Sequence, residues 1–263
     1  MASTSNGTRE DDDEGDEDKV EFKSCFTNWM TQQEDDLEEL NRVMEFDSDD
    51  EVKLRAVVER VLGHFQNYLD KRSQTVRHNV SGLNIPSWCP TFEKSVLWMG
   101  GCRATICIRL VYALCGFEAE ATIMEYLQGV RRENIGELTV NQFNLINTLQ
   151  MNTTMEENRL CAEMISFQDS MVDEPLMSIA KCAKVVGERS EAIERAIERK
   201  TMEMGNLMKE ANKLRLNTLK ELLTNILTPL QSVKFLIVSK KLHLSLHQWS
   251  DNRDEVFNPT HNE

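Results

Sequence analysis

Two histidines near the C-terminus are the residues best placed to do chemistry. His243 and His247 are four residues apart in a predicted helix, so their imidazoles share one face about 6 Å apart. A divalent metal could accept both nitrogens, but no adjacent carboxylate or thiol completes a tetrahedral set. Haem takes axial ligands from opposite faces, so one histidine could bind iron while the other positions a propionate or lies outside the site. The alternative is two partly exposed histidines beside Lys240 and Lys241.

The motifs of the common enzyme mechanisms are missing from the sequence. It contains no Gly-x-x-x-x-Gly-Lys, Gly-x-Gly-x-x-Gly, Gly-x-Ser-x-Gly or His-Glu-x-x-His. Its seven cysteines form no Cys-x-x-Cys pair, and most stand in apolar stretches, where a reduced cysteine acts as a small hydrophobic residue. Redox sensing by these thiols is the less expected alternative. We therefore predict no catalytic residue, no metal site and no enzymatic activity.

Composition excludes several classes of partner. The 263 residues carry 30 Lys and Arg against 44 Asp and Glu, a formal net charge of -14. Binding to DNA or to an anionic membrane by bulk charge needs a basic surface, so neither is expected. No stretch approaches the roughly 18 apolar residues of a membrane helix, and the acidic N-terminus does not resemble a secretory signal. The sequence therefore predicts a protein of the nucleus and cytoplasm.

Apolar residues recur at helical spacing from residue 20 onward, and no run alternates with period two. The sequence predicts an all-α fold, a bundle of long antiparallel helices with a central short-helix unit. Residues 1–19 are almost entirely polar and largely acidic, so we expect a disordered tail there. Residues 20–252 then form a single domain, and residues 253–263 form a frayed tail.

Three capping boxes mark the predicted starts of long helices. In each, a Ser or Thr side chain and a Glu or Gln side chain three residues later accept hydrogen bonds from each other's backbone amides. The three boxes pair Ser48 with Glu51, Thr139 with Gln142, and Thr228 with Gln231. The helices that follow are expected to run to about residues 80, 171 and 249.

The middle of the chain predicts shorter helices and one very long helix. Residues 103–114 are nearly all apolar, which indicates a buried central helix, and a further short helix is expected over residues 119–130. Proline and glycine make residues 81–90 a loop. A helix from residue 175 to about 227 carries a near-heptad apolar stripe, which could be satisfied within the bundle or across a dimer by self-association.

Several segments resemble the plant delay-of-germination domain, which also forms the C-terminal half of TGA-type bZIP transcription factors. The most specific reads Pro-Thr-Phe-Glu-Lys-Ser-Val-Leu-Trp-Met-Gly-Gly-Cys-Arg at residues 90–103, followed by Arg-Leu-Val-Tyr-Ala-Leu at residues 109–114. Residues 25–40 resemble the opening helix of the family, and residues 227–249 its closing helix. The resemblance covers roughly residues 22–252, and Cys102 departs from the usual aromatic residue.

The family signature has a structural explanation of its own. Residues 97–99 are expected to pack in a short helix that Gly100 and Gly101 terminate. Arg103 and Arg109 flank an apolar helix and are expected to pair with buried carboxylates, for example Glu93. These residues are assigned to the fold and not to an active site.

The resemblance implies a non-enzymatic regulator of abscisic-acid-linked signalling and gene expression. It implies restraint of clade A type 2C protein phosphatases, with the contact near Phe26, Trp29 and Met30, although Trp29 also fits an ordinary core position. It also places haem at His243 and His247. The basic region and zipper of TGA factors are replaced here by an acidic tail. The alternatives are therefore a co-regulator that reaches DNA through bZIP factors, or a haem or metal sensor.

Overall fold

Helices provide the regular structure of this chain. The computed structural model describes residues 10–75, 86, 89–115, 138–182 and 190–257. Within these ranges there is no β-strand, only an isolated bridge between Trp98 and Gly101. The prediction of an all-α fold is confirmed. No helix in the described ranges combines the length and apolarity needed to cross a membrane.

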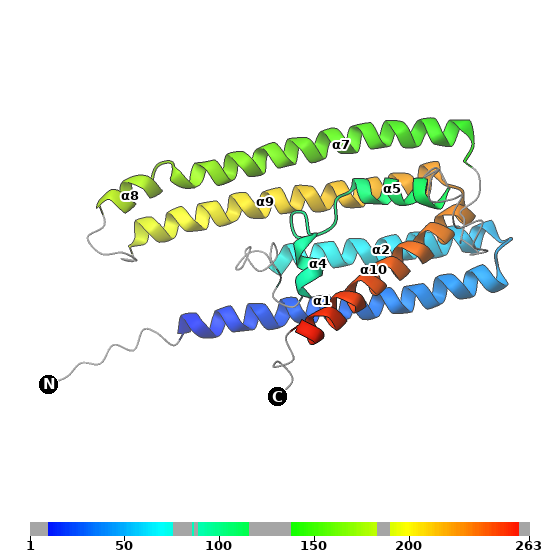
Figure 1. Cartoon of the computed structure of the whole chain (residues 1–263), viewed down its shortest axis with the longest axis horizontal. Coiled ribbons are helices and arrows are strands. Elements are labelled where there is room, and N and C mark those ends of the chain that lie inside the picture. The colour runs from blue at the N-terminus through cyan, green and yellow to red at the C-terminus, as the bar shows by residue number, and fades with distance from the viewer. Residues whose placement is uncertain (1–9, 76–85, 87–88, 116–137, 183–189, 258–263) are drawn as a thin grey trace.

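Two antiparallel helix pairs form the body of the molecule (Figure 1). In the first pair, α1 (Glu10–Phe46) packs along α2 (Glu51–Thr75). In the second, α7 (Val140–Asp169) packs along α9 (Glu191–Glu221). Contacts between α2 and α9 bring the two pairs together.

The last helix and two short helices connect these pairs. α10 (Pro229–Phe257) packs across α1 and α2, and it also contacts α4 (Thr91–Ser95) and α5 (Thr105–Leu114). α5 contacts α7 and α9 as well, so the expected central short-helix unit is present. The core lies at this junction, and its largest fully buried side chains include Leu40, Leu54, Ile108, Ile146, Leu222 and Phe235. Ile106 is 43% exposed, so the helix that we predicted to be buried has one exposed edge.

The single long helix predicted over residues 175–227 is wrong. After α7 come a 3-10 turn (Ser170–Val172) and α8 (Leu176–Cys182), and α9 begins separately at Glu191. Ser190 is the N-cap of α9, with extended backbone and its hydroxyl accepting from the Ile193 amide. Along α9, Ala196, Met208 and Ala211 are buried within the chain, whereas other apolar side chains, such as Ile197 and Met202, are exposed.

Two of the three predicted capping boxes are confirmed. Thr139 and Gln142 exchange side-chain to backbone hydrogen bonds of 3.0 and 3.2 Å at the start of α7. Thr228 and Gln231 do the same at the start of α10, at 2.9 and 3.3 Å. This box follows a π-helical turn (Leu222–Ile226) that ends the α9 segment.

The predicted capping role of Ser48 is wrong. The carboxylate of Asp50 accepts hydrogen bonds from the Val52 and Lys53 amides, both 3.1 Å long, at the start of α2. Aspartate caps a helix as well as serine does, and Asp50 stands directly before the first helical residue.

The ends of the chain contain more helix than predicted. α1 begins at Glu10, so residues 10–19 are helical although we expected a disordered tail there. α10 continues to Phe257, past the predicted end near residue 249 and into the expected frayed tail. The helix expected over residues 119–130 and most of the loop at 81–90 lie outside the described residues.

Candidate functional site

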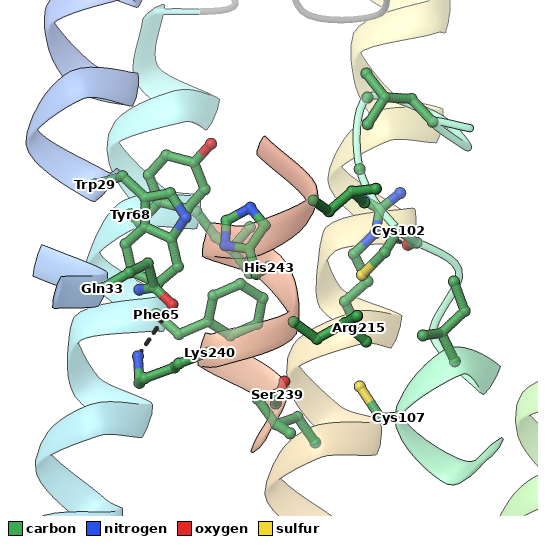
Figure 2. A pocket seen from close by; sticks show the side chains of 18 of the residues that line it. Trp29, Gln33, Phe65, Tyr68, Cys102, Cys107, Arg215, Ser239, Lys240 and His243 are labelled. Atoms are coloured by element: carbon green, nitrogen blue, oxygen red, sulfur yellow. Dashed lines mark hydrogen bonds between the residues drawn. The ribbon is translucent and has the colours of Figure 1, made fainter. Parts of the chain in front are cut away.

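A cavity of about 350 Å³ lies between α1, α2, α10 and the segment that leads into α5. Its wall is mostly apolar, and Figure 2 shows the side chains of Trp29, Phe65 and Tyr68 facing His243 across it. Arg215, from α9, closes the opposite side together with Cys102 and Cys107. The size and the apolar wall are typical of a pocket for a small molecule.

The two histidines have different surroundings despite their common helix. His243 lines the cavity and is partly buried. His247 is turned toward Glu93, with 2.7 Å between its Nδ1 and the carboxylate Oε2, and it is absent from the cavity wall. Its ring also packs against Phe26, with 5.4 Å between the ring centroids. No cluster of three His, Cys, Asp or Glu side chains within the described ranges could hold a metal ion.

The predicted contact residues of the opening helix point mainly inward. Trp29 is 9% exposed and stacks on Tyr68, with 4.4 Å between ring centroids. Phe26 and Met30 are partly buried, and Phe26 lines the cavity. The structure therefore gives Trp29 a packing role, and the side chain of Asn28 next to it is exposed. Contact of these residues with a phosphatase stays a prediction.

A buried ionic network ties three helices together beside the cavity. Lys240 of α10 donates to Asp36 Oδ2 at 2.8 Å and to Gln33 Oε1 at 3.0 Å, both on α1. His64 of α2 lies 2.7 Å from the other oxygen of Asp36. Burial lowers the pKa of Lys240, and the neighbouring carboxylate of Asp36 acts in the opposite direction. The sequence analysis missed this network, although Lys240 interrupts an apolar stretch of α10, and a buried lysine requires a partner.

The signature segment forms a tight turn and not the end of a helix. α4 ends at Ser95, and Trp98 and Gly101 exchange backbone hydrogen bonds of 2.7 and 3.1 Å. Met99 and Gly100 between them have left-handed backbone, with φ of 46° and 69°. A Cβ on Gly101 would lie 3.0 Å from the guanidinium carbon of Arg215, so the second glycine lets Arg215 pack closely against the turn.

Arginines anchor this turn to the second helix pair. Buried Arg215 donates to the backbone oxygens of Trp98, Met99 and Cys102. Arg103 pairs with Glu157 of α7, with 2.7 Å between Nη2 and Oε2. The expected pairing of Arg103 with Glu93 is therefore wrong, because the fold brings Glu93 to His247 instead.

Comparisons with known proteins show the family of the chain. A sequence model of the seed dormancy control family, DOG1, matches residues 36–113. The chain is 32% identical to Protein DOG1-like 1 of Arabidopsis thaliana over 252 residues, which is 88% of this chain and 89% of that protein. The chain belongs to the DOG1 family. It is also 24% identical to the Arabidopsis Protein RESPONSE TO ABA AND SALT 1 over 242 residues, 88% of this chain and 96% of that protein.

A more distant likeness connects this DOG1 family member to transcription factors. It is 23% identical to the Arabidopsis Transcription factor TGA6 over 235 residues, which is 87% of this chain and 61% of that protein. The segment matched by the DOG1 model includes Asp36, the signature turn and α5, whereas Lys240 and His243 lie beyond it on α10. The cavity wall of this DOG1 family member therefore contains residues from inside the matched segment and residues from outside it.

Two cysteines in the cavity wall of the DOG1 family chain, Cys89 and Cys107, are poor nucleophiles. Burial raises the pKa of Cys89 to about 12, and burial also raises the pKa of Cys107. The thiolate is the reactive form of cysteine, so both side chains stay protonated at neutral pH. This favours a packing role for these two thiols over redox sensing.

We expect His243 to make the stability of this DOG1 family member depend on pH. Burial lowers the pKa of His243 in the folded state, with smaller opposing and supporting effects from Glu93, His247 and Lys240. Below pH about 6.5 the unfolded chain takes up a proton that the folded chain resists. The free energy of unfolding therefore has its full value above pH about 6.5. As the pH is lowered from there toward the pKa of His243 in the folded state, it falls by at most about 1.4 kcal/mol per pH unit.

Urea unfolding from about pH 7.5 to about pH 5.5 measures this dependence. The matched variant is His243→Gln, which keeps a polar side chain but removes the titration. The free energy of unfolding of His243→Gln should change less with pH than that of the wild type. Because the other titratable groups are common to both proteins, the difference reports His243 together with its interactions with Glu93, His247 and Lys240. Equal slopes in the two proteins would show that His243 titrates normally.

Proposed function

We propose that this chain is a non-enzymatic regulator of abscisic-acid-linked signalling and gene expression that acts by protein contacts and restrains clade A type 2C protein phosphatases. The observation that carries the proposal is the 32% identity to a DOG1-like protein over 88% of the chain. The likeness to a relative named for its response to ABA and salt supports the hormonal link. The cavity wall, with its protonated thiols at Cys89 and Cys107, supports a role outside catalysis.

The proposed phosphatase surface is the outward side of α1 around Asn28. Thr27, Asn28 and Thr31 are exposed there, and the partly buried Phe26 and Met30 lie along one edge. Trp29 lies beneath this surface, where its ring stacks on Tyr68. A partner that docks here would contact the exposed polar residues and bury the exposed parts of Phe26 and Met30.

We expect Asn28→Arg to weaken binding to a purified clade A type 2C phosphatase by at least about tenfold, because a long charged side chain disrupts a packed interface. Asn28 is exposed, so the free energy of unfolding should change by less than about 0.5 kcal/mol. The matched control is Asn152→Arg, at an exposed position on α7. Calorimetric titration gives the affinities, and equal loss in both variants would remove the support for the α1 surface.

The second candidate is a co-regulator that associates with TGA-type bZIP factors. The likeness to TGA6 favours this candidate, since the matched region covers 87% of the chain and 61% of that factor. With a net charge of -14, the chain should not shift a DNA probe alone, but should do so when a TGA factor is added. Direct binding with a steep salt dependence would contradict this mode. Both candidates place the chain in the nucleus and cytoplasm.

The third candidate is a haem sensor, and its fit depends on His243. This imidazole lines the cavity, and its lowered pKa keeps it in the neutral form that binds iron. His247 is turned to Glu93, so the two histidines do not suit opposite axial positions. Haem, a macrocycle of four pyrrole rings with two ionised propionates, is larger than this cavity of about 350 Å³, so it would have to extend beyond the cavity; when bound, it would supply a redox- or gas-responsive centre.

A haem titration followed at the Soret band tests which histidine is used. We expect His243→Ala to weaken haem binding by at least about tenfold and His247→Ala to change it little, because one axial ligand contributes a large part of haem affinity. Unchanged spectra in both variants would move the haem site elsewhere or exclude it.

A further inference from the structure

The side-chain amide of Gln33 contains a buried hydrogen-bond donor without a partner. Gln33 is 4% exposed, and its Nε2 is the one buried side-chain nitrogen or oxygen in the described part of the chain that lacks a hydrogen bond there. A buried amide donor left unsatisfied costs about 1–3 kcal/mol, so such a group in a native fold indicates a missing acceptor.

The direction of this amide is fixed by its neighbour. Gln33 Oε1 accepts from Lys240 Nζ at 3.0 Å, the contact drawn as a dashed line in Figure 2. A lysine ammonium has donors only, so the opposite orientation of the amide would place two donors against each other. The Nε2 group therefore has to face away from Lys240. Gln33 lines the cavity, but Nε2 itself has no free surface, so a ligand acceptor reaches it only when the Gln33 side chain rotates slightly.

The charged side chains of the cavity wall already have protein partners. Lys240 pairs with Asp36, and Arg215 donates to backbone oxygens of the signature turn. Arg72 donates to the Gly100 oxygen at 2.7 Å, and Glu93 binds His247. The amide of Gln33 and the neutral imidazole of His243 are the polar groups of the wall that remain for a ligand, and both suit an uncharged molecule with an oxygen acceptor. An ionised ligand would have to compete for cations that are already bound.

We propose that the cavity binds an uncharged, mostly apolar small molecule through a carbonyl oxygen that accepts from Gln33 Nε2. The volume of about 350 Å³ suits a compact molecule of one or two rings. Trp29 and Phe65 offer flat apolar surface on the same side as Gln33. Apolar cavities of this kind exclude water and gain affinity from apolar ligands. This site is independent of the phosphatase surface on the outward side of α1.

The test uses the fluorescent ketone 6-propionyl-2-dimethylaminonaphthalene (Prodan) with the full purified chain. We expect saturable binding at one site per chain, with a blue shift of the emission. Ser239→Phe, which fills part of the cavity wall on α10, should remove this binding while far-UV circular dichroism shows intact helices. No saturable binding to the folded wild-type chain would overturn the proposal, as would full binding by Ser239→Phe.

A matched ligand pair isolates the proposed hydrogen bond. Displacement of Prodan gives the affinities of 2-acetylnaphthalene, which has a carbonyl, and 2-ethylnaphthalene, which does not. In Gln33→Met, the ratio of the two affinities should fall about tenfold relative to the wild type, which is the contribution of one buried hydrogen bond. Any general loosening by the substitution affects both ligands equally. An unchanged ratio would show that Gln33 does not bind the carbonyl, and would overturn the proposal.

Discussion

Replacing Lys240 with methionine is expected to lower the free energy of unfolding by about 3 kcal/mol, because it leaves a buried carboxylate without its cation. Asp36 is 1% exposed and loses an ion pair of 2.8 Å. His64, 2.7 Å from the other carboxylate oxygen, remains and compensates in part, so the loss should lie at the lower end for a broken buried pair. Urea unfolding followed by far-UV circular dichroism measures it.

Two variants separate this effect from a general effect of the substitution. Lys241→Met changes an exposed neighbour on the same helix and should cost less than about 0.5 kcal/mol. Adding Asp36→Asn to Lys240→Met removes the stranded charge and should restore at least about 1 kcal/mol. If Lys240→Met costs no more than Lys241→Met, the buried network does not hold α1, α2 and α10 together.

Glu157→Ala is expected to lower the free energy of unfolding by a similar amount, about 3 kcal/mol. Glu157 is 1% exposed and accepts from Arg103 Nε, from the Thr105 amide and from the Thr105 hydroxyl, at 2.9 to 3.1 Å. Its loss leaves the first turn of α5 without an acceptor and frees the signature segment from α7. Urea unfolding again gives the change in free energy.

The control for this substitution is the same change at the preceding residue of α7. Glu156→Ala removes a carboxylate whose side chain is 51% exposed and that binds Arg159 on the surface. Exposed pairs contribute at most about 1 kcal/mol, so Glu156→Ala should be far milder than Glu157→Ala. Similar losses in the two variants would contradict the role assigned to Glu157.

The features that the sequence predicted well are local. The boxes at Thr139 and Thr228 are confirmed because both partners are three residues apart, and the all-α class follows from periodicity over single helices. Local signals can also point to the wrong residue. Asp50, and not Ser48, caps α2, and Ser190 begins a new helix within the apolar stripe that we interpret as continuous from the sequence. Cap residues of similar strength in one segment cannot be ranked from sequence alone.

The features that the sequence did not predict depend on contacts between distant segments. Asp36 and Lys240 are 204 residues apart, and Glu93 and His247 are 154 residues apart. Helical periodicity shows which face of a helix is apolar, but not which polar residue of another helix will meet a buried charge. The free amide of Gln33 is visible only when both the cavity and the Lys240 contact are known.

We propose that this DOG1 family member regulates by protein contact, with a type 2C phosphatase as its partner. The most direct measurement is affinity purification of the tagged chain, as wild type and as Asn28→Arg, from plant nuclear and cytosolic extract, with partners identified by mass spectrometry. We expect the wild type to recover clade A type 2C phosphatases and Asn28→Arg to lose them. Recovery of bZIP factors without phosphatases would contradict the claim and support the co-regulator.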